Sequence, residues 1–321
     1  MSEATGGRAD SPLRAYLRAA IAPSPGADPV TEALLAVIRQ RHGDSIQAVL
    51  AYGSWLRGKR DTVLDFYVLL DDYRSLPGWQ RALAWLLAPN VYHIGAELPR
   101  EGRSHVVRAK YAVLTPARWR RGNARAFHSY FWARFAQPSR TLYCRDADAE
   151  ATLLDGLEAA PGRFAGRVLA MLPARFDSRA LWQGGLSLTY RCELRSERPG
   201  QAEALYQANR GHFDTLTRLL ADGRLGFAAR DEDDFQQPPP TALQRRAAAV
   251  QWWLRAGWGK LLSLARVTKG ALTFEAPLEY LLWKIERHSG LRVQPTPRQL
   301  RHPLLFAWPL LWRLYRQGAF R

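Results

Sequence analysis

Residues 48–73 read AVLAYGSWLRGKRDTVLDFYVLLDDY, and this stretch decides the fold. The apolar run from about Ile46 to Tyr52 predicts a buried strand, which Gly53-Ser54 ends in a turn. A short helical turn rich in Arg and Lys follows, and a second strand is predicted from about Val63 to Leu70. Asp65 lies inside this second strand, where a carboxylate is costly unless a cation pairs with it.

The turn and the carboxylate together favour a site that handles nucleotides. A strand, a Gly-Ser turn and a helix can form a phosphate cradle, because backbone N–H groups and the helix dipole point at the anion. We therefore predict a nucleotidyltransferase-fold domain in which Gly53 and Ser54 hold the triphosphate and Asp65 holds its Mg²⁺. Many enzymes of this fold carry Asp-x-Asp on that strand, whereas the second position here is Tyr67.

Four basic side chains are candidates for contacts with phosphate. Lys110 interrupts an apolar strand predicted over residues 106–114, which indicates a phosphate or Asp65 as its partner. A lysine on an edge strand that extends its ammonium group to solvent is the alternative. Arg57 and Lys59 follow the Gly-Ser turn and are placed to meet the triphosphate, with a solvated basic turn as the alternative. Arg134 lies among aromatic residues and is a candidate for binding lipid phosphate or nucleotide.

Asp71 is a second candidate metal ligand, after Asp65. It comes six residues after Asp65, which is too far along a strand for both to share one ion directly. A polar strand end is therefore the alternative interpretation of Asp71.

The composition indicates an anionic partner. The chain has 321 residues, a formal net charge of +17 and a pI near 10.5, so nucleic acid, a nucleotide or an anionic membrane surface fits. Cys144 and Cys192 lack metal-ligand spacing and favour a reducing compartment. No apolar run reaches the roughly 18 residues that span a bilayer, and the N-terminus does not resemble a secretory signal. We expect a cytoplasmic protein that is soluble or peripheral on a membrane.

The chain divides into three predicted parts. Residues 1–150 are expected to form an α/β (α+β) domain with a mixed sheet, and residues 151–235 a helical domain, for which a winged helix is one alternative. The acidic run Asp231–Asp234, followed by three prolines, predicts a linker. Residues 241–321 are basic and rich in Trp, with one long helix over Leu243–Lys269; Trp and Arg favour the headgroup region of a bilayer. An ordinary core helix with a basic outer face is the alternative.

A series of short motifs runs in order along the chain: Tyr52-Gly53-Ser54, Leu64-Asp65-Phe66 with Asp71-Asp72, Asn90-Val91-Tyr92, Lys110-Tyr111-Ala112-Val113-Leu114, Trp132-Ala133-Arg134-Phe135-Ala136-Gln137-Pro138, Met171-Leu172-Pro173, Gly185-Leu186-Ser187 and Thr268-Lys269-Gly270. In this order they resemble the mitochondrial-type CDP-diacylglycerol synthases, the Tam-type phosphatidate cytidylyltransferases. The matches span about residues 48–215, with one at 268. This family also lacks the second acid after its Asp-Phe. Departures are Trp55 and Ala112 in place of glycines, and a lost Gly-Asp for which Glu193 is a candidate replacement.

The resemblance implies a Mg²⁺-dependent enzyme of phospholipid biosynthesis that transfers CMP from CTP to phosphatidic acid, giving CDP-diacylglycerol and pyrophosphate. It further implies that Tyr52, Gly53 and Ser54 bind CTP, that Lys110 neutralises phosphate, and that the protein docks on the inner face of the cell membrane. Two alternatives stay open: a nucleotidyltransferase acting on RNA or a small molecule, and a binding module of this fold without activity. The sequence carries no RNA-recognition signature, so we expect no specific nucleic-acid partner.

Overall fold

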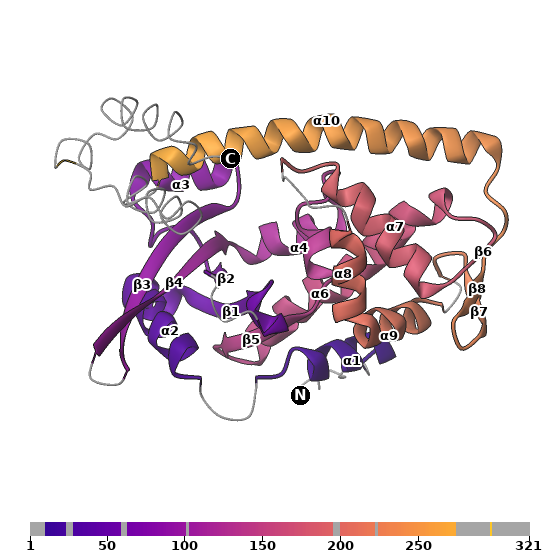
Figure 1. The fold of residues 1–321 in the computed structure, drawn as a ribbon. Helices are drawn as coiled ribbons and strands as arrows, with labels where there is room; N and C mark the ends of the chain where they lie inside the picture. The colour runs from indigo at the N-terminus through magenta and orange to yellow at the C-terminus, as the bar shows by residue number, and fades with distance from the viewer. Residues whose placement is uncertain are drawn as a thin grey trace, which may run out of the picture. The chain divides into compact units, whose positions relative to one another are not determined.

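The computed structural model describes residues 10–23, 28–58, 63–100, 103–194, 200–221, 224–273 and 296. The chain divides into two compact units, Met1–Val267 and Thr268–Arg321. The elements described below belong to the first unit, apart from the last turns of its final helix (Figure 1).

A five-stranded mixed sheet organises the first unit. Its strands are β1 (Ile46–Tyr52), β2 (Leu64–Leu70), β3 (Asn90–Arg100), β4 (Arg103–Leu114) and β5 (Ser139–Cys144), in the spatial order β3-β4-β2-β1-β5. Strands β2 and β4 run parallel, and the other neighbours are antiparallel. The predicted α/β fold with a mixed sheet is therefore confirmed, and β1 has the bounds that its apolar run indicates.

Helices cover both faces of this sheet, because successive strand residues point to opposite sides. On one face, α2 (Pro29–His42) and α3 (Gly78–Leu86) pack on a core that includes Val68 of β2. On the other face, Tyr67 and Leu69 of β2 belong to a larger core. That core contains residues of α1 (Pro12–Ala20), α4 (Pro116–Ala124), α5 (Trp132–Phe135) and α6 (Ala147–Val168).

The larger core continues into the helical part of the chain without interruption. After α6 come β6 (Arg175–Phe176), α7 (Ser178–Tyr190), α8 (Gln201–Ala208), α9 (Arg210–Leu220), β7 (Ala228–Asp231) and β8 (Asp234–Gln236). The three short strands form an antiparallel sheet in the order β6-β8-β7. Strand β6 precedes the helices and pairs with β8, the last strand of the hairpin that follows them. A winged helix has this arrangement of strands and helices.

The prediction that the acidic run Asp231–Asp234 forms a linker is wrong. Asp231 ends β7 and Asp234 begins β8, so the run forms the turn of a hairpin. Phe235 in the same hairpin is fully buried and anchors it in the larger core, which local charge could not reveal. The prolines that follow separate this hairpin from the last helix.

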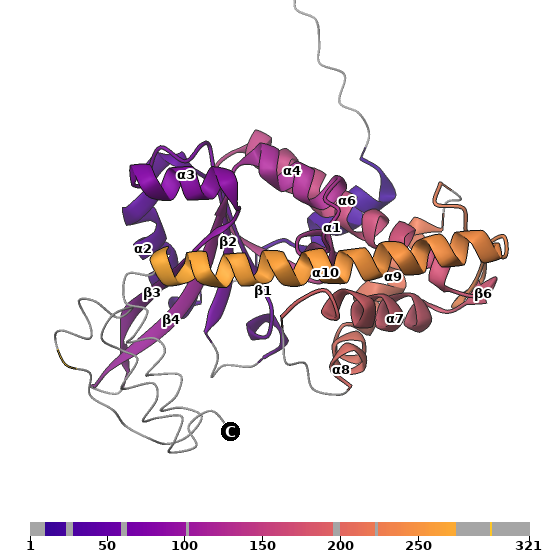
Figure 2. The same ribbon diagram turned by 90° about the horizontal axis from the view of Figure 1, so that it is seen from above.

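One long helix, α10 (Ala242–Thr273), follows, as predicted. Its inner face carries the buried side chains of Trp252 and Arg255, and Trp252 Nε1 donates to the carbonyl of Arg167 at the end of α6. Figures 1 and 2 show α10 beginning near β6 and passing along α7. Among the described residues, no helix combines the length and the hydropathy that crossing a membrane requires.

Candidate active site

A row of polar side chains crosses four neighbouring strands of the sheet. Tyr52 of β1 lies opposite Asp65 of β2, Asp65 opposite Lys110 of β4, and Lys110 opposite His93 of β3. Residues that lie opposite one another in neighbouring strands project to the same face of a sheet. Because Tyr67, two positions after Asp65, belongs to the larger core, the row lies on the face that this core covers.

The centre of the row is an ion pair. Lys110 Nζ lies 2.9 Å from Asp65 Oδ1, with the Asp65 side chain 18% exposed and the Lys110 side chain 42% exposed. Asp65 was one of the two partners predicted for Lys110, and the structure shows this pair. Burial and the Lys110 charge lower the pKa of His93 to about 4, so its ring is neutral at pH 7. The row therefore presents one carboxylate, one ammonium group and one neutral imidazole.

Gly53 brings the backbone close to the carboxylate of Asp65. Its φ of +93° lies in the region that favours glycine, and a Cβ placed on it would be 3.1 Å from Asp65 Oδ2. The short helical turn predicted after Ser54 is confirmed as a single turn of 3-10 helix, Trp55–Arg57. A turn this short has almost no macrodipole, so any anion binding here depends on backbone N–H groups and nearby cations.

Arg57 is one of those cations. Its Nη1 donates to the carbonyl of Gly53 at 3.2 Å, which fixes the guanidinium beside the turn. Burial lowers the pKa of Arg57, and the nearby charge of Asp65 opposes that shift. Lys59, the other basic candidate in this loop, lies outside the described residues.

Arg134 is buried on the same face of the sheet, beside Tyr52. Its Nη1 donates to the hydroxyl of Tyr67 at 2.9 Å, and its guanidinium lies 5.3 Å from the centre of the Tyr52 ring. Glu193, the candidate for the missing acid, has Oε2 3.9 Å from Arg134 Nη2. The position at which many enzymes of this fold carry a second acid is thus a tyrosine that accepts a hydrogen bond from a buried cation.

Asp71 does not join this group. Tyr52 and Asp65 pair at one end of β1 and β2, whereas Asp71 follows the other end of β2. Its carboxylate accepts hydrogen bonds from Arg145 at 2.8 and 3.1 Å and from Gln47 at 2.7 Å. The bond from Arg145 is the main reason that the pKa of Asp71 is lowered. The structure therefore places Asp71 in a surface ion pair and separates it from Asp65.

The residues around Asp65 fit a Mg²⁺ ion only if a substrate supplies other ligands. Among the described residues, no three His, Cys, Asp or Glu side chains lie close enough together to hold a metal ion. Protein sites for Mg²⁺ commonly use one or two carboxylates, with substrate phosphates and waters completing the octahedron. Asp65 suits this arrangement, because its Oδ2 faces the Gly53 turn where a phosphate would enter.

Two residues that the sequence did not single out extend the site. The Tyr130 ring lies 4.2 Å from the guanidinium carbon of Arg134 and 4.1 Å from that of Arg266. Arg266 comes from α10, and its Nε donates to the carbonyl of Ala88 at 3.3 Å. Because Arg266 lies far from Tyr130 and Arg134 in the chain, no local pattern could have joined them.

Comparisons with known proteins give little further information. No protein-family model matches the chain, and no curated protein sequence is similar to it. A crystal structure of a nucleotidyltransferase-like protein from Exiguobacterium sibiricum 255-15 aligns over 91% of this chain and 92% of its own, with 12% identity and a TM-score of 0.23. A TM-score this low supports no inference about function.

Proposed function

We propose that this protein is a Mg²⁺-dependent nucleotidyltransferase, and specifically a CTP:phosphatidate cytidylyltransferase that makes CDP-diacylglycerol. The observation that carries the proposal is the Asp65–Lys110 pair beside the left-handed turn at Gly53. Together they offer one carboxylate for a metal ion, one cation for phosphate and backbone N–H groups for a triphosphate. The ordered motifs described above supply the choice of CTP and phosphatidic acid.

In the proposed reaction, an oxygen of the phosphatidate phosphate attacks the α-phosphorus of CTP. A new P–O bond forms, the bond from the α-phosphorus to the bridging oxygen breaks, and pyrophosphate leaves. Mg²⁺, when bound, would neutralise charge on the triphosphate. The residues of this chain supply position and charge: Gly53 and Ser54 hold the triphosphate, Asp65 holds the metal ion, and Lys110 and Arg57 neutralise the phosphates.

The outer face of α10 supports docking on a bilayer. Seven large apolar side chains on this helix are between 47% and 78% exposed, and we call them the apolar stripe: Leu243, Val250, Trp253, Leu254, Trp258, Leu261 and Leu264. Many of the spacings along the stripe are three, four or seven residues, which place side chains on one side of a helix. The buried Trp252 lies on the other side of the helix from most of the stripe, and Arg255 borders the stripe three residues before Trp258. An exposed apolar face of this length is unusual and marks a contact surface.

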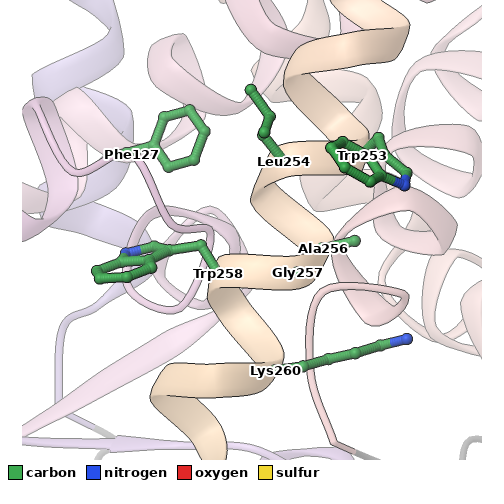
Figure 3. A pocket seen from close by; sticks show the side chains of 7 residues that line it. All are labelled: Phe127, Trp253, Leu254, Ala256, Gly257, Trp258 and Lys260. Carbon is green, nitrogen blue, oxygen red and sulfur yellow. The ribbon is translucent and has the colours of Figure 1, made fainter.

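A pocket opens beside the stripe (Figure 3). It has a volume of about 660 Å³ and is lined by Phe127, Trp253, Leu254, Ala256, Gly257, Trp258 and Lys260. Phe127 and Trp258 lie on one side of the helix in Figure 3, and Trp253 and Lys260 on the other. Apolar walls with a single ammonium group suit a lipid chain next to an anionic headgroup. We therefore place the protein on the inner face of the cell membrane, as a peripheral protein.

The stripe also favours lipid over nucleic acid as the anionic partner. Nucleic-acid interfaces are polar and positively charged, because they must neutralise a phosphate backbone. The exposed face of α10 instead offers Leu, Val and Trp, which gain little from phosphates and much from acyl chains. A net charge of +17 then serves to attract an anionic leaflet.

The deciding experiment follows labelled CTP into a lipid-extractable product, with purified protein, Mg²⁺ and vesicles that contain phosphatidic acid. Wild-type protein should make a CDP-lipid, and Asp65→Asn should lose at least about a hundredfold of this rate, as removal of one preorganised electrostatic contact commonly does. Asp71→Asn is the matched control, since it removes the same charge at the other end of β2. Equal losses in both variants, or no product from wild type, would refute the proposal.

The membrane contact has its own test. Wild-type protein should float with phosphatidylglycerol vesicles, and the double variant Trp253→Ser, Trp258→Ser should stay in solution at the same salt concentration. Arg245→Gln, on an exposed part of the same helix, removes charge without shortening the stripe and should still float. Unchanged flotation of the double variant would mean that the stripe does not contact the bilayer.

A further inference from the structure

Two arginines from different elements lie against one aromatic ring. Arg134 of α5 and Arg266 of α10 place their guanidinium carbons 4.2 and 4.1 Å from the centre of the Tyr130 ring. The Arg134 side chain is only 10% exposed, and both Arg266 and Tyr130 are half-buried. We call Arg134, Tyr130 and Arg266 the arginine clamp.

The clamp has a surplus of positive charge. Glu193 is the nearest carboxylate to Arg134, at 3.9 Å, which is a long ion pair. Among the described residues, no carboxylate forms an ion pair with Arg266; its Nε donates to the carbonyl of Ala88, and Glu193 acts on it only at longer range. A cation kept away from water without a counter-ion is costly, and aromatic rings offset only about 1–2 kcal/mol of that cost. An anion from solution would supply the missing charge.

Tyr130 responds to this surplus. Burial raises the pKa of its hydroxyl, but the charges of Arg134 and Arg266 outweigh burial and leave the pKa below its ordinary value. Hydrogen bonds to Tyr67 and Arg134 lower the pKa in the same direction.

The clamp lies next to Tyr52, at the end of the strand that leads into the Gly53 turn. Arg134 also lies 5.3 Å from the ring of Tyr52, the residue before Gly53. Arg57 and Lys110, by contrast, are tied to Gly53 and Asp65. The site thus holds two groups of cations, one beside the Gly53 turn and one around Tyr130.

We propose that the arginine clamp binds the phosphate monoester of the acceptor substrate. A guanidinium group presents a planar fork of donors that matches phosphate oxygens, and a doubly charged monoester suits two such forks. This inference deepens the proposed function and rests on it for the identity of the acceptor. It makes Arg266 a substrate-binding residue, supplied by the helix that carries the apolar stripe.

Binding can be measured without CTP, Mg²⁺ or turnover. The full chain is titrated calorimetrically with dihexanoyl phosphatidic acid below its micelle concentration, and separately with inorganic phosphate. Wild type should bind the short-chain phosphatidate, and Arg266→Gln should raise its Kd by about tenfold or more, as expected for a hydrogen bond between charged groups. Arg245→Gln removes the same charge from the same helix and should bind like wild type. Inorganic phosphate should compete if the phosphate group itself is what the clamp recognises.

The outcomes separate the clamp from the proposed reaction. Clamp-dependent phosphatidate binding without CMP transfer would support the clamp and refute the reaction. Transfer with an unchanged KM for phosphatidate in Arg266→Gln would refute the clamp and leave the reaction standing. A rise in the KM for CTP alone would assign Arg266 to the nucleotide and overturn the inference. If Arg266→Gln does not fold, Arg266→Lys keeps the charge without the planar fork, and an unchanged Kd in that variant refutes the clamp.

Discussion

Replacing Gly53 with alanine tests whether the turn and the carboxylate form one site. An L side chain in the left-handed region costs about 1–2 kcal/mol, and φ at Gly53 is +93°. The added Cβ would also lie 3.1 Å from Asp65 Oδ2, so the carboxylate must move by a few tenths of an ångström. Because the Asp65–Lys110 pair is partly exposed, disturbing it adds less than about 1 kcal/mol. Gly53→Ala should therefore lose about 1–3 kcal/mol of unfolding free energy.

Gly58 provides a matched control in the same loop. Its φ is +82°, but a Cβ placed there meets nothing within 4 Å. Gly58→Ala should show the backbone cost alone, about 1–2 kcal/mol, with CTP binding kept. Urea denaturation gives both stabilities, and titration with CTP and Mg²⁺ gives both affinities. If Gly58→Ala loses as much CTP affinity as Gly53→Ala, strain in the loop explains the loss and the contact with Asp65 does not.

Three further predictions concern the core and the ionisable groups. In α6, Gly156→Ala should cost about 1–3 kcal/mol, because the new Cβ would overlap the indole of the buried Trp119. Gly162→Ala should gain about 0.5–1 kcal/mol, because its Cβ would make only an ordinary van der Waals contact with Leu220 Cδ2 at 4.0 Å; thermal melts of both variants check this. Burial lowers the pKa of His42, His128 and His212 to about 4. Below pH 6.5 the unfolded chain therefore binds protons that the folded chain does not. The free energy of unfolding should fall toward pH 4 by up to about 1.4 kcal/mol per pH unit for each of these histidines. An unfolding free energy that is flat between pH 6.5 and 4.5 would contradict this. Lys110→Gln should raise the pKa of His93, since the Lys110 charge is one of the causes that lower it, and an NMR titration of the ring would show no shift if the two groups do not interact.

Local patterns in the sequence predicted the parts of the site that one strand or one turn determines. The apolar run before Gly53 gave the bounds of β1, and Lys110 was correctly expected to have Asp65 among its partners. Such inferences succeed because burial of charge is costly wherever the strand is placed. The short helical turn predicted after Ser54 is likewise present, as one turn of 3-10 helix.

Contacts that depend on strand register or on distant segments could not be predicted. The row from His93 to Tyr52 exists only because β2 pairs in parallel with β4 at one particular register. A shift by one residue would turn Lys110 to the other face of the sheet. Arg266 follows Tyr130 by more than a hundred residues, and nothing in the sequence near it indicates a ring contact. The prediction of a linker over the acidic run was wrong for the same reason. Phe235, which fixes this hairpin, packs in a core formed by residues far away in the sequence.

The helix α10 connects the two proposals physically. Its outer side carries the apolar stripe, while Arg255 and Arg266 turn inward to the carbonyls of Phe127 and Ala88. A continuous helix holds side chains on its opposite sides at fixed relative positions, since every peptide group is hydrogen-bonded to the next turn. A bilayer bound to the stripe would therefore hold Arg266 at a fixed depth, next to lipid headgroups that carry the phosphate it is proposed to bind. If so, activity on vesicles should fall when the stripe residues outside the pocket, Val250, Leu261 and Leu264, are replaced by serine, while Kd for soluble dihexanoyl phosphatidic acid stays unchanged. A parallel loss of both would mean that the stripe variants damage the clamp itself and that the two faces of α10 are not independent.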